Sequence, residues 1–181
     1  MHLSDFSYRL PDELIAHYPV EKRSDSRLLC LNARSGAIDH RIFNSLIDLL
    51  RPDDLLVFND TRVIPARLKG RREPAGGLVE TTLIKSGGGG CWQALARPAR
   101  RLKPGDVITF GPALAAEVVA KGEGGEVTLR FPLTDQELMA ALETHGIMPL
   151  PPYIRRKPGS DARDLGDSQT LFAARPGAVA A

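Results

Sequence analysis

The chain has 181 residues, of which 43% are hydrophobic and 25% are charged, and its formal net charge is +2. This composition is typical of a soluble globular protein that buries a core in one ordinary domain or two small ones. No stretch approaches the roughly 18 unbroken apolar residues of a membrane helix, and the first residues lack the basic and apolar blocks of a signal peptide. We therefore expect a cytoplasmic protein with no membrane segment.

The predicted elements of the first 50 residues are short. A helix is predicted over residues 11–16, where a proline starts the segment and two acids stand in the first turn. Apolar-rich segments at 27–31 and 37–43 flank five residues rich in turn formers, which predicts a hairpin. A second short helix is predicted over residues 44–50, because the proline at position 52 disfavours helical geometry just before it.

The two cysteines, Cys30 and Cys91, are far apart in the sequence and have no partners at metal-ligand spacing. We predict two buried, reduced thiols in preference to a disulfide or a zinc site. No metal site is predicted.

A run of four apolar residues at 55–58 predicts a strand buried on both faces. A carboxamide, a carboxylate, a hydroxyl and a guanidinium follow it directly, from Asn59, Asp60, Thr61 and Arg62. Ligands of α/β sheets usually bind where strands end, so this motif predicts a site at the rim of a sheet. The alternative is that these groups only tie the strand end to a domain junction.

From residue 65 the pattern changes to short β-like segments that glycine and proline interrupt at intervals of about 10 residues. This spacing favours a small antiparallel barrel. The four glycines at 87–90 are interpreted as a flexible hairpin tip, since neither the Lys-Ser or Lys-Thr pair nor the helix of a phosphate loop follows them. The predicted strands span residues 78–85, 92–96, 106–110, 115–120 and 126–131.

Positive charge is concentrated in residues 62–103, which hold ten Lys and Arg against two acids, whereas the remaining residues sum to −6. A polyanion such as nucleic acid would approach the positive segment first. The other interpretation, that these side chains only solvate a small β surface, stays open. The arginines concerned are Arg71, Arg72, Arg97, Arg100 and Arg101.

The best-defined helix is predicted over residues 135–145. Thr134 and Glu137 form a capping box, apolar residues share one face, and Gly146 ends the helix. His145 stands at its end, where interaction with the last carbonyls is favoured over a catalytic role.

The segment 148–154 is predicted to be stiff and extended, because its prolines fix the backbone, and it presents Tyr153. A mobile loop is expected over 155–167, before an ordered pattern resumes at 169–172. The small apolar residues 177–181 predict a strand or loop that is interrupted before its partner.

Several segments resemble, in the same order, one family: the S-adenosylmethionine:tRNA ribosyltransferase-isomerases of queuosine biosynthesis. The most specific are 54–68, which contains Asn-Asp-Thr-Arg, and 148–154, which contains Pro-Leu-Pro-Pro-Tyr. The family pattern continues past residue 181, so we expect a truncated chain with little or no turnover on its own. Further matching segments are Asp5-Phe6-Ser7, Leu14–Pro19, Arg27-Leu28-Leu29 and Gly177–Ala181.

The resemblance implies a larger α/β domain that is interrupted by a small β-barrel. This agrees with the changes of pattern near residues 65 and 148. We therefore expect a mixed α+β fold and a monomer. A partial α/β domain of residues 1–61 plus 148–181 would carry an inserted antiparallel barrel domain, residues 62–147, that ends in a helix.

The resemblance also implies a reaction. The ribosyl part of S-adenosylmethionine is transferred to 7-aminomethyl-7-deazaguanine at the wobble position of a tRNA, which gives epoxyqueuosine and releases adenine and methionine. No cofactor is expected, because S-adenosylmethionine is the ribosyl-donor substrate. Its sulfonium acidifies the hydrogens on the ribose 5′ carbon, so a positioned base can remove one and open the sugar. The expected partners are therefore S-adenosylmethionine and the modified tRNA.

Roles for individual residues follow from this chemistry as hypotheses. Asp60 would act as the base or hold the cationic aminomethyl group, Asn59 would bind a base edge or a ribose hydroxyl, and Thr61 would orient both. Arg62 and Arg67 would bind the methionine carboxylate or an RNA phosphate. The expected contacts of the substrate with the rest of the chain are stacking on Tyr153 and polar contacts with Gln169 and Thr170.

One departure from the family pattern precedes the last two of these residues: Ser168 stands where the family usually has Tyr. We therefore expect the stacking or packing contact of that Tyr to be missing at Ser168. Two other classes of protein were considered. A noncatalytic RNA-binding barrel would bind tRNA without S-adenosylmethionine, whereas an ordinary methyltransferase is disfavoured because its glycine-rich turn after the first strand is missing.

Overall fold

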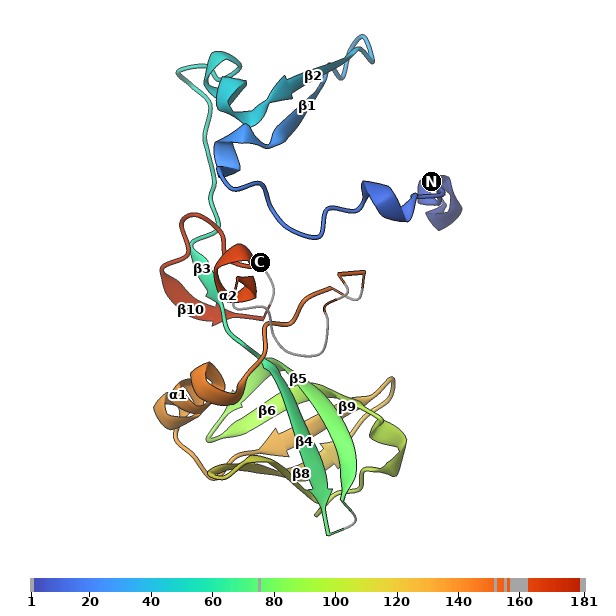
Figure 1. Ribbon diagram of the computed structural model, residues 1–181, viewed down its shortest axis with the longest axis vertical. Helices are drawn as coiled ribbons and strands as arrows, with labels where there is room; N and C mark the ends of the chain where they lie inside the picture. Colours follow the sequence, from blue (N-terminus) through green and yellow to red (C-terminus); the bar gives the residue numbers. More distant parts are fainter. Residues whose placement is uncertain (1, 75, 152, 155, 157–162, 180–181) are drawn as a thin grey trace. The chain divides into compact units, whose positions relative to one another are not determined.

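The computed structural model describes residues 2–74, 76–151, 153–154, 156 and 163–179 (Figure 1). The chain forms two compact units: Met1–Phe58 with Pro152–Arg155, and Asn59–Pro151 with Arg156–Ala181. Within the described residues, no helix has the length and apolar character needed to cross a membrane. The predicted mixed fold with a small antiparallel barrel is confirmed, while the predicted domain limits stay a prediction.

The first unit is built on a hairpin of two antiparallel strands. β1 (Arg27–Leu31) pairs with β2 (Ile38–Ile42), as predicted. The Asn32 side chain accepts hydrogen bonds from the backbone N–H groups of the next turn, which fixes the connection. The two expected helices are short 3₁₀ turns, and the turns of this unit are η1 (Leu3–Phe6), η2 (Asp12–Leu14), η3 (Arg23–Asp25) and η4 (Phe43–Asp48).

Two predictions for this unit are wrong. Residues 55–58 form no strand, and their side chains are exposed, with Leu55 at 87% and Val57 at 85%. A hydrophobic run becomes a buried strand only where neighbouring strands pair with it and cover it, and no described segment does so here. Cys30 is half-buried rather than buried, as is Cys91 in the other unit, and both are free thiols.

A closed six-stranded barrel makes up most of the second unit, with the strand order β4-β5-β6-β9-β8-β7 (Figure 1). Alternate side chains fill its interior, as in the sequence 91–97, where every second residue is buried. Neighbouring strands are antiparallel throughout. The strands are β4 (Arg67–Glu73), β5 (Gly77–Gly88), β6 (Cys91–Arg97), β7 (Val107–Gly111), β8 (Leu114–Lys121) and β9 (Glu126–Arg130).

Five of these strands are predicted ones, and β4 is an addition. Charged residues dominate its sequence, Arg-Leu-Lys-Gly-Arg-Arg-Glu, and so hide the alternation that buries Leu68 and Gly70. A Cβ on Gly70 would lie 2.6 Å from the Phe110 ring and 2.7 Å from the Thr109 carbonyl oxygen, so only glycine lets β4 approach β7 this closely. The glycines at 88–90 have positive φ at the β5–β6 turn, which confirms the hairpin tip.

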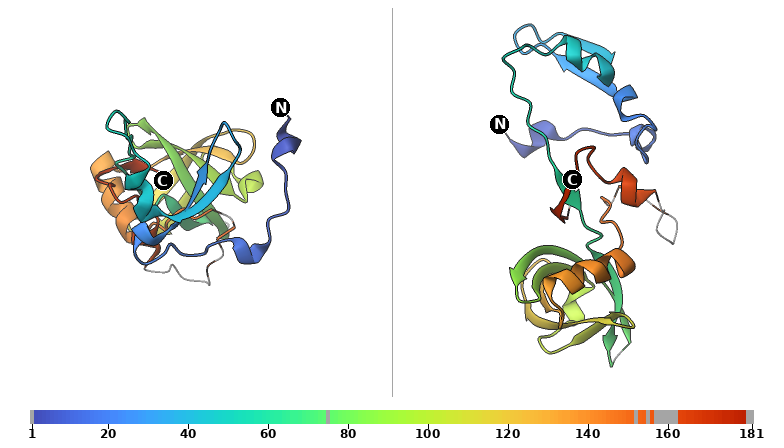
Figure 2. Two further views of the ribbon diagram at one scale, coloured as in Figure 1. Left: turned by 90° about the horizontal axis from the view of Figure 1, so that it is seen from above. Right: turned by 90° about the vertical axis from the view of Figure 1, so that its left-hand side faces the viewer.

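Helix α1 (Asp135–His145) packs on the barrel (Figure 2). Its capping box is present, and Leu138 and Leu142 are fully buried in the barrel core. After the helix, Ile147 exchanges two backbone hydrogen bonds with Arg67, at 3.1 and 2.8 Å. The segment after α1 is thereby joined to the first strand of the barrel.

A small parallel sheet lies outside the barrel in the same unit. β3 (Thr61–Val63) pairs with β10 (Arg175–Ala178), which brings residues more than 100 positions apart side by side. The short helix α2 (Asp164–Asp167) precedes β10. Asp164 is 4% exposed, and Arg156 donates to its carboxylate from two nitrogens, so this buried charge is compensated.

Candidate functional site

The Asn-Asp-Thr-Arg motif lies at the start of β3, not at the end of a preceding strand. The Asn59 carboxamide accepts a hydrogen bond of 2.9 Å from the Thr61 N–H, which turns the chain into the strand. The Thr170 hydroxyl donates to the Asn59 carbonyl at 2.9 Å. The β3–β10 pairing and this contact therefore bring five predicted site residues near one another, Asn59, Asp60, Thr61, Arg62 and Thr170.

The Asp60 carboxylate is about half exposed and lies 3.6 Å from Arg175 Nε. Both side chains are well solvated, so this ion pair contributes little to stability. The Asp60 carbonyl accepts the N–H groups of Ala174 and Arg175, at 2.8 and 3.2 Å. The backbone is fixed in this way while the carboxylate stays accessible to a ligand.

The side-chain amide of Gln169 pairs with the backbone of β3 in the way that a neighbouring strand would. Its carboxamide oxygen accepts the Val63 N–H at 2.8 Å, and its nitrogen donates to the Val63 carbonyl at 2.9 Å. Val63 is 4% exposed, so these contacts satisfy two buried backbone groups. The geometry assigns the Gln169 amide a structural use within β3.

A pocket of about 470 Å³ lies beside this sheet, within the second unit. Arg62 lines it, and no partner of the Arg62 guanidinium occurs in the described part of the chain. Its polar lining also includes Glu143 of α1, so the pocket offers one cation and one anion beside apolar surface. The remaining lining residues are Val63, Ile64, Pro65, Met139, Leu142, Met148, Leu165, Gln169 and Pro176.

Sequence reasoning missed the contribution of α1 to this pocket. Glu143 lies on a helix that was interpreted only by its apolar face and its caps, and nothing in the local sequence marks it. Met139 and Leu142 show the helical spacing of core residues, which conceals their second contact with the pocket. The only signal that could find these residues is the docking of α1 beside β3, and that is tertiary.

The predicted substrate contact Arg67 is engaged within the protein. One guanidinium nitrogen donates to the Leu150 carbonyl at 3.0 Å, and Nε lies 3.8 Å from a Glu80 carboxylate oxygen. Its side chain is only 28% exposed. The structure therefore places Arg67 as a link between β4, β5 and the segment after α1.

Tyr153 belongs to the other compact unit, and its side chain is 58% exposed. Its predicted role, stacking on a base, stays a prediction. Of the neighbouring predicted loop over 155–167, residues 155 and 157–162 lie outside the described residues. Its last four residues form α2, so the loop prediction is wrong there.

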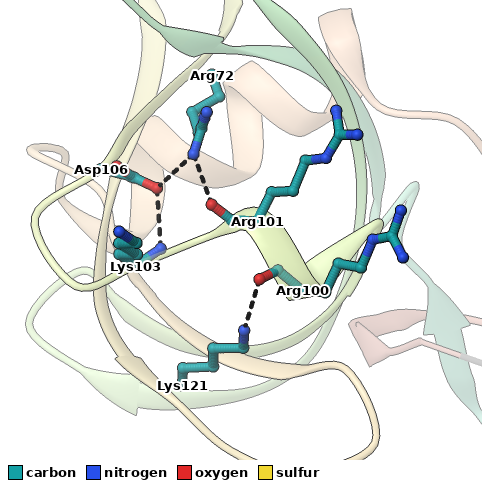
Figure 3. A network of polar contacts seen from close by, with 6 residues as sticks. All are labelled: Arg72, Arg100, Arg101, Lys103, Asp106 and Lys121. Atoms are coloured by element: carbon teal, nitrogen blue, oxygen red, sulfur yellow. Dashed lines mark hydrogen bonds and ion pairs between the residues drawn. The ribbon is translucent and has the colours of Figure 1, made fainter. Parts of the chain in front are cut away.

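The five predicted RNA-binding arginines lie on the barrel and on the 3₁₀ turn η5 (Ala99–Arg101). Some of their guanidinium groups are bound within the protein, and others are exposed. Arg72 donates to the Arg101 carbonyl and lies 3.4 Å from Asp106, and Arg71 donates to the Gly76 carbonyl. Arg97 is exposed on β6, and Figure 3 shows the side chains of Arg100 and Arg101 extending away from the polar contacts that hold the turn.

Comparison with known proteins gives a consistent set of relatives. S-adenosylmethionine:tRNA ribosyltransferase-isomerases from Rhodospirillum rubrum and Methylocella silvestris are 51% and 49% identical to the chain. All of this chain is covered, but only 51% and 52% of those proteins, so the chain spans about half the length of the curated relatives it matches.

A crystal structure of an S-adenosylmethionine tRNA ribosyltransferase from Thermotoga maritima is 38% identical and covers 80% of this chain and 55% of that one. Its TM-score of 0.37 is too low to support an argument about the fold. A family model described as a queuosine biosynthesis protein matches residues 3–181. This match, over nearly the whole chain, shows that the chain belongs to the queuosine biosynthesis protein family.

Proposed function

We propose that this chain acts in the ribosyl transfer and isomerisation for which its relatives are named. In this reaction the ribosyl part of S-adenosylmethionine is transferred to 7-aminomethyl-7-deazaguanine in tRNA, giving epoxyqueuosine, adenine and methionine. The observation that carries the proposal is the family match over residues 3–181. Because the chain spans about half the length of its relatives, the proposal assigns to it only the groups that the described residues contain.

The pocket beside β3 is suited to S-adenosylmethionine. Its volume of about 470 Å³ is within the usual range for small-molecule sites. The Arg62 guanidinium would bind the methionine carboxylate through two parallel hydrogen bonds. Glu143 would face the positive charge of the sulfonium or the amino group, and the apolar lining would contact the methylene chain.

Asp60 is the proposed base or the anchor of the aminomethyl group. Its carboxylate is exposed just before β3, two residues from Arg62. Asp60 does not line the pocket, so in this proposal it contacts the part of the substrates that extends out of the pocket. Asn59 and Thr61 form a turn that fixes the backbone around it. Gln169, Thr170 and Arg67 act as positioning residues in this proposal, because each is hydrogen-bonded to the protein backbone.

A chimera tests this function. The front half of the Rhodospirillum rubrum relative is replaced by this chain, and release of adenine is measured with S-adenosylmethionine and tRNA carrying 7-aminomethyl-7-deazaguanine. We expect adenine release that depends on the tRNA. A folded chimera that binds both substrates and releases no adenine would contradict the proposal.

The Asp60→Asn variant of the chimera tests the proposed role of that carboxylate. General-base catalysis contributes about 10²- to 10⁴-fold, so we expect adenine release to fall by at least about 100-fold. Asp53→Asn is the matched control, since it removes another exposed carboxylate. Unchanged ribosyl transfer in Asp60→Asn would remove Asp60 from the catalytic residues.

The second candidate function is a noncatalytic RNA-binding barrel, which the basic side chains around η5 favour. Calorimetry with S-adenosylmethionine separates the two functions. Salt-sensitive binding of tRNA with no binding of S-adenosylmethionine by the chimera would support the second candidate.

A further inference from the structure

The turn η5 is held rigidly at one end of the barrel. Its flanking residue Leu102 is 1% exposed, so the chain on one side of the turn is anchored in the core. The Arg72 guanidinium, from β4, donates to the Arg101 carbonyl. The Lys121 ammonium, from β8, donates to the Arg100 carbonyl at 3.3 Å. Two strands therefore fix the carbonyls of this turn (Figure 3).

Within the group of side chains drawn in Figure 3, the carboxylate of Asp106 is engaged locally. Asp106 accepts the Lys103 N–H at 2.9 Å and lies 3.4 Å from Arg72. The side chains of Arg72 and Asp106 are 23% and 22% exposed, so their charges are largely directed at each other. The positive potential of the surface therefore comes from the other members of the group, Arg100, Arg101, Lys103 and Lys121.

Arg100 and Arg101 differ from Arg72 in being available to a ligand. Both are exposed, and within the described residues neither guanidinium has a hydrogen-bond or ion-pair partner. Their backbone is already fixed, so binding would carry no added cost for ordering this turn. Guanidinium groups match the geometry of phosphate oxygens, which makes this pair suited to a sugar-phosphate backbone.

We propose that Arg100 and Arg101 on η5 form the phosphate-binding contact of this chain with RNA, and that Arg72 and Lys121 serve to hold the turn. This proposal rests on the proposed function for the identity of the partner as tRNA. It also distinguishes the basic residues that contact RNA from those that hold the turn, which the charge distribution alone does not do. The Lys103 ammonium, exposed and without a hydrogen-bond or ion-pair partner among the residues that the structure describes, adds a third cation beside the pair.

The test measures binding of fluorescently labelled tRNA to the 181-residue chain by anisotropy over a series of salt concentrations, without S-adenosylmethionine. Arg100→Gln/Arg101→Gln removes two phosphate contacts. The slope of log affinity against log salt should therefore become shallower by about 1.4 to 1.8, and the affinity should fall. Thermal unfolding of each variant verifies that the barrel is intact.

Two control variants distinguish the effect of this surface on the salt slope from the effect of net charge alone. Lys85→Gln, compared with Arg100→Gln alone, removes one exposed charge from the end of the β5–β6 pairing that lies away from Arg97 and η5. It should keep the slope of the unmodified chain. Arg72→Gln removes a cation that faces Asp106, so it should lower thermal stability and leave the slope unchanged.

An equal change of slope in Lys85→Gln and Arg100→Gln would overturn the proposal, as would an unmodified chain that binds no tRNA. Competition by polyglutamate as effective as that by unlabelled tRNA at equal charge would show a general anion surface and would also overturn it. Because the assay involves no ribosyl transfer, its outcome is independent of adenine release by the chimera.

Discussion

Replacing Gln169 with alanine tests whether this residue supports β3 or contacts a substrate. The side chain makes two hydrogen bonds, of 2.8 and 2.9 Å, to the backbone of Val63. In the Gln169→Ala variant both backbone groups lose their partners, and Val63 is 4% exposed, so water replaces them poorly. Leaving a buried polar group unpaired costs about 1 to 3 kcal/mol.

The Val63 amide reports this loss directly through hydrogen exchange. A decrease of about 2 kcal/mol in the free energy of local opening corresponds to exchange about 30-fold faster, because 1.4 kcal/mol is tenfold. Gln169→Glu should show an intermediate effect. Its carboxylate can accept the Val63 N–H, but it has no donor for the Val63 carbonyl.

Thr170→Val is the matched control for this prediction. It removes a hydrogen bond to Asn59 from the adjacent position and should change Val63 exchange much less. The Leu68 amide in the barrel should exchange at the same rate in all variants. Unchanged exchange at Val63 together with lost binding of S-adenosylmethionine in a Gln169→Ala chimera would refute the structural role of the amide and restore its role as a ligand contact.

Three further predictions follow from single side chains. The Thr81 hydroxyl is fully buried and has no hydrogen-bond partner among the described residues. Thr81→Val should therefore raise the unfolding free energy by about 1 kcal/mol in urea titrations followed by Trp92 fluorescence, and a lower unfolding free energy would contradict this. Hydrogen bonds from the Thr134 N–H and hydroxyl lower the pKa of Glu137. The carboxylate therefore stabilises the fold above its ordinary pKa, and this stability is lost as the pH falls through the lowered folded-state pKa. Glu137→Gln should lower the melting temperature at neutral pH, and the deficit should vanish on acidification; a constant deficit would contradict the assignment. In the chimera, Arg62→Ala should weaken S-adenosylmethionine binding about 10- to 150-fold by calorimetry, because a hydrogen bond to a charged group contributes about 1.5 to 3 kcal/mol. Arg62→Lys should weaken the binding less. Unaltered affinity would exclude Arg62 as the carboxylate contact.

Local sequence was sufficient where short-range physics controls the structure. The capping box at Thr134 and Glu137 and the spacing of Leu138 and Leu142 define α1 without tertiary information. Turn residues likewise predict the β1–β2 hairpin and five barrel strands. β4 was missed because its outward-facing side chains are charged and its inward-facing ones include a glycine.

The strand predicted at 55–58 shows the limit of such reasoning. Four apolar residues indicate that a segment benefits from burial, but burial depends on partners that pair with it on either side. Residues 55–58 have no such strand partners in the described chain and are exposed. Hydrophobicity therefore indicates that a segment tends to be buried, and pairing with distant segments decides whether it is buried as a strand.

For the candidate site, the sequence by itself determined the chemical groups, the concentration of positive charge and the family. It did not determine which groups are free. Tertiary structure alone turns Gln169 and Arg67 toward backbone partners, leaves Arg62 in a pocket with Glu143, and separates the anchored Arg72 from the exposed Arg100 and Arg101. The physical reason is that a polar side chain is available to a ligand only if no buried backbone group or opposite charge has already taken it, and those partners come from distant parts of the chain.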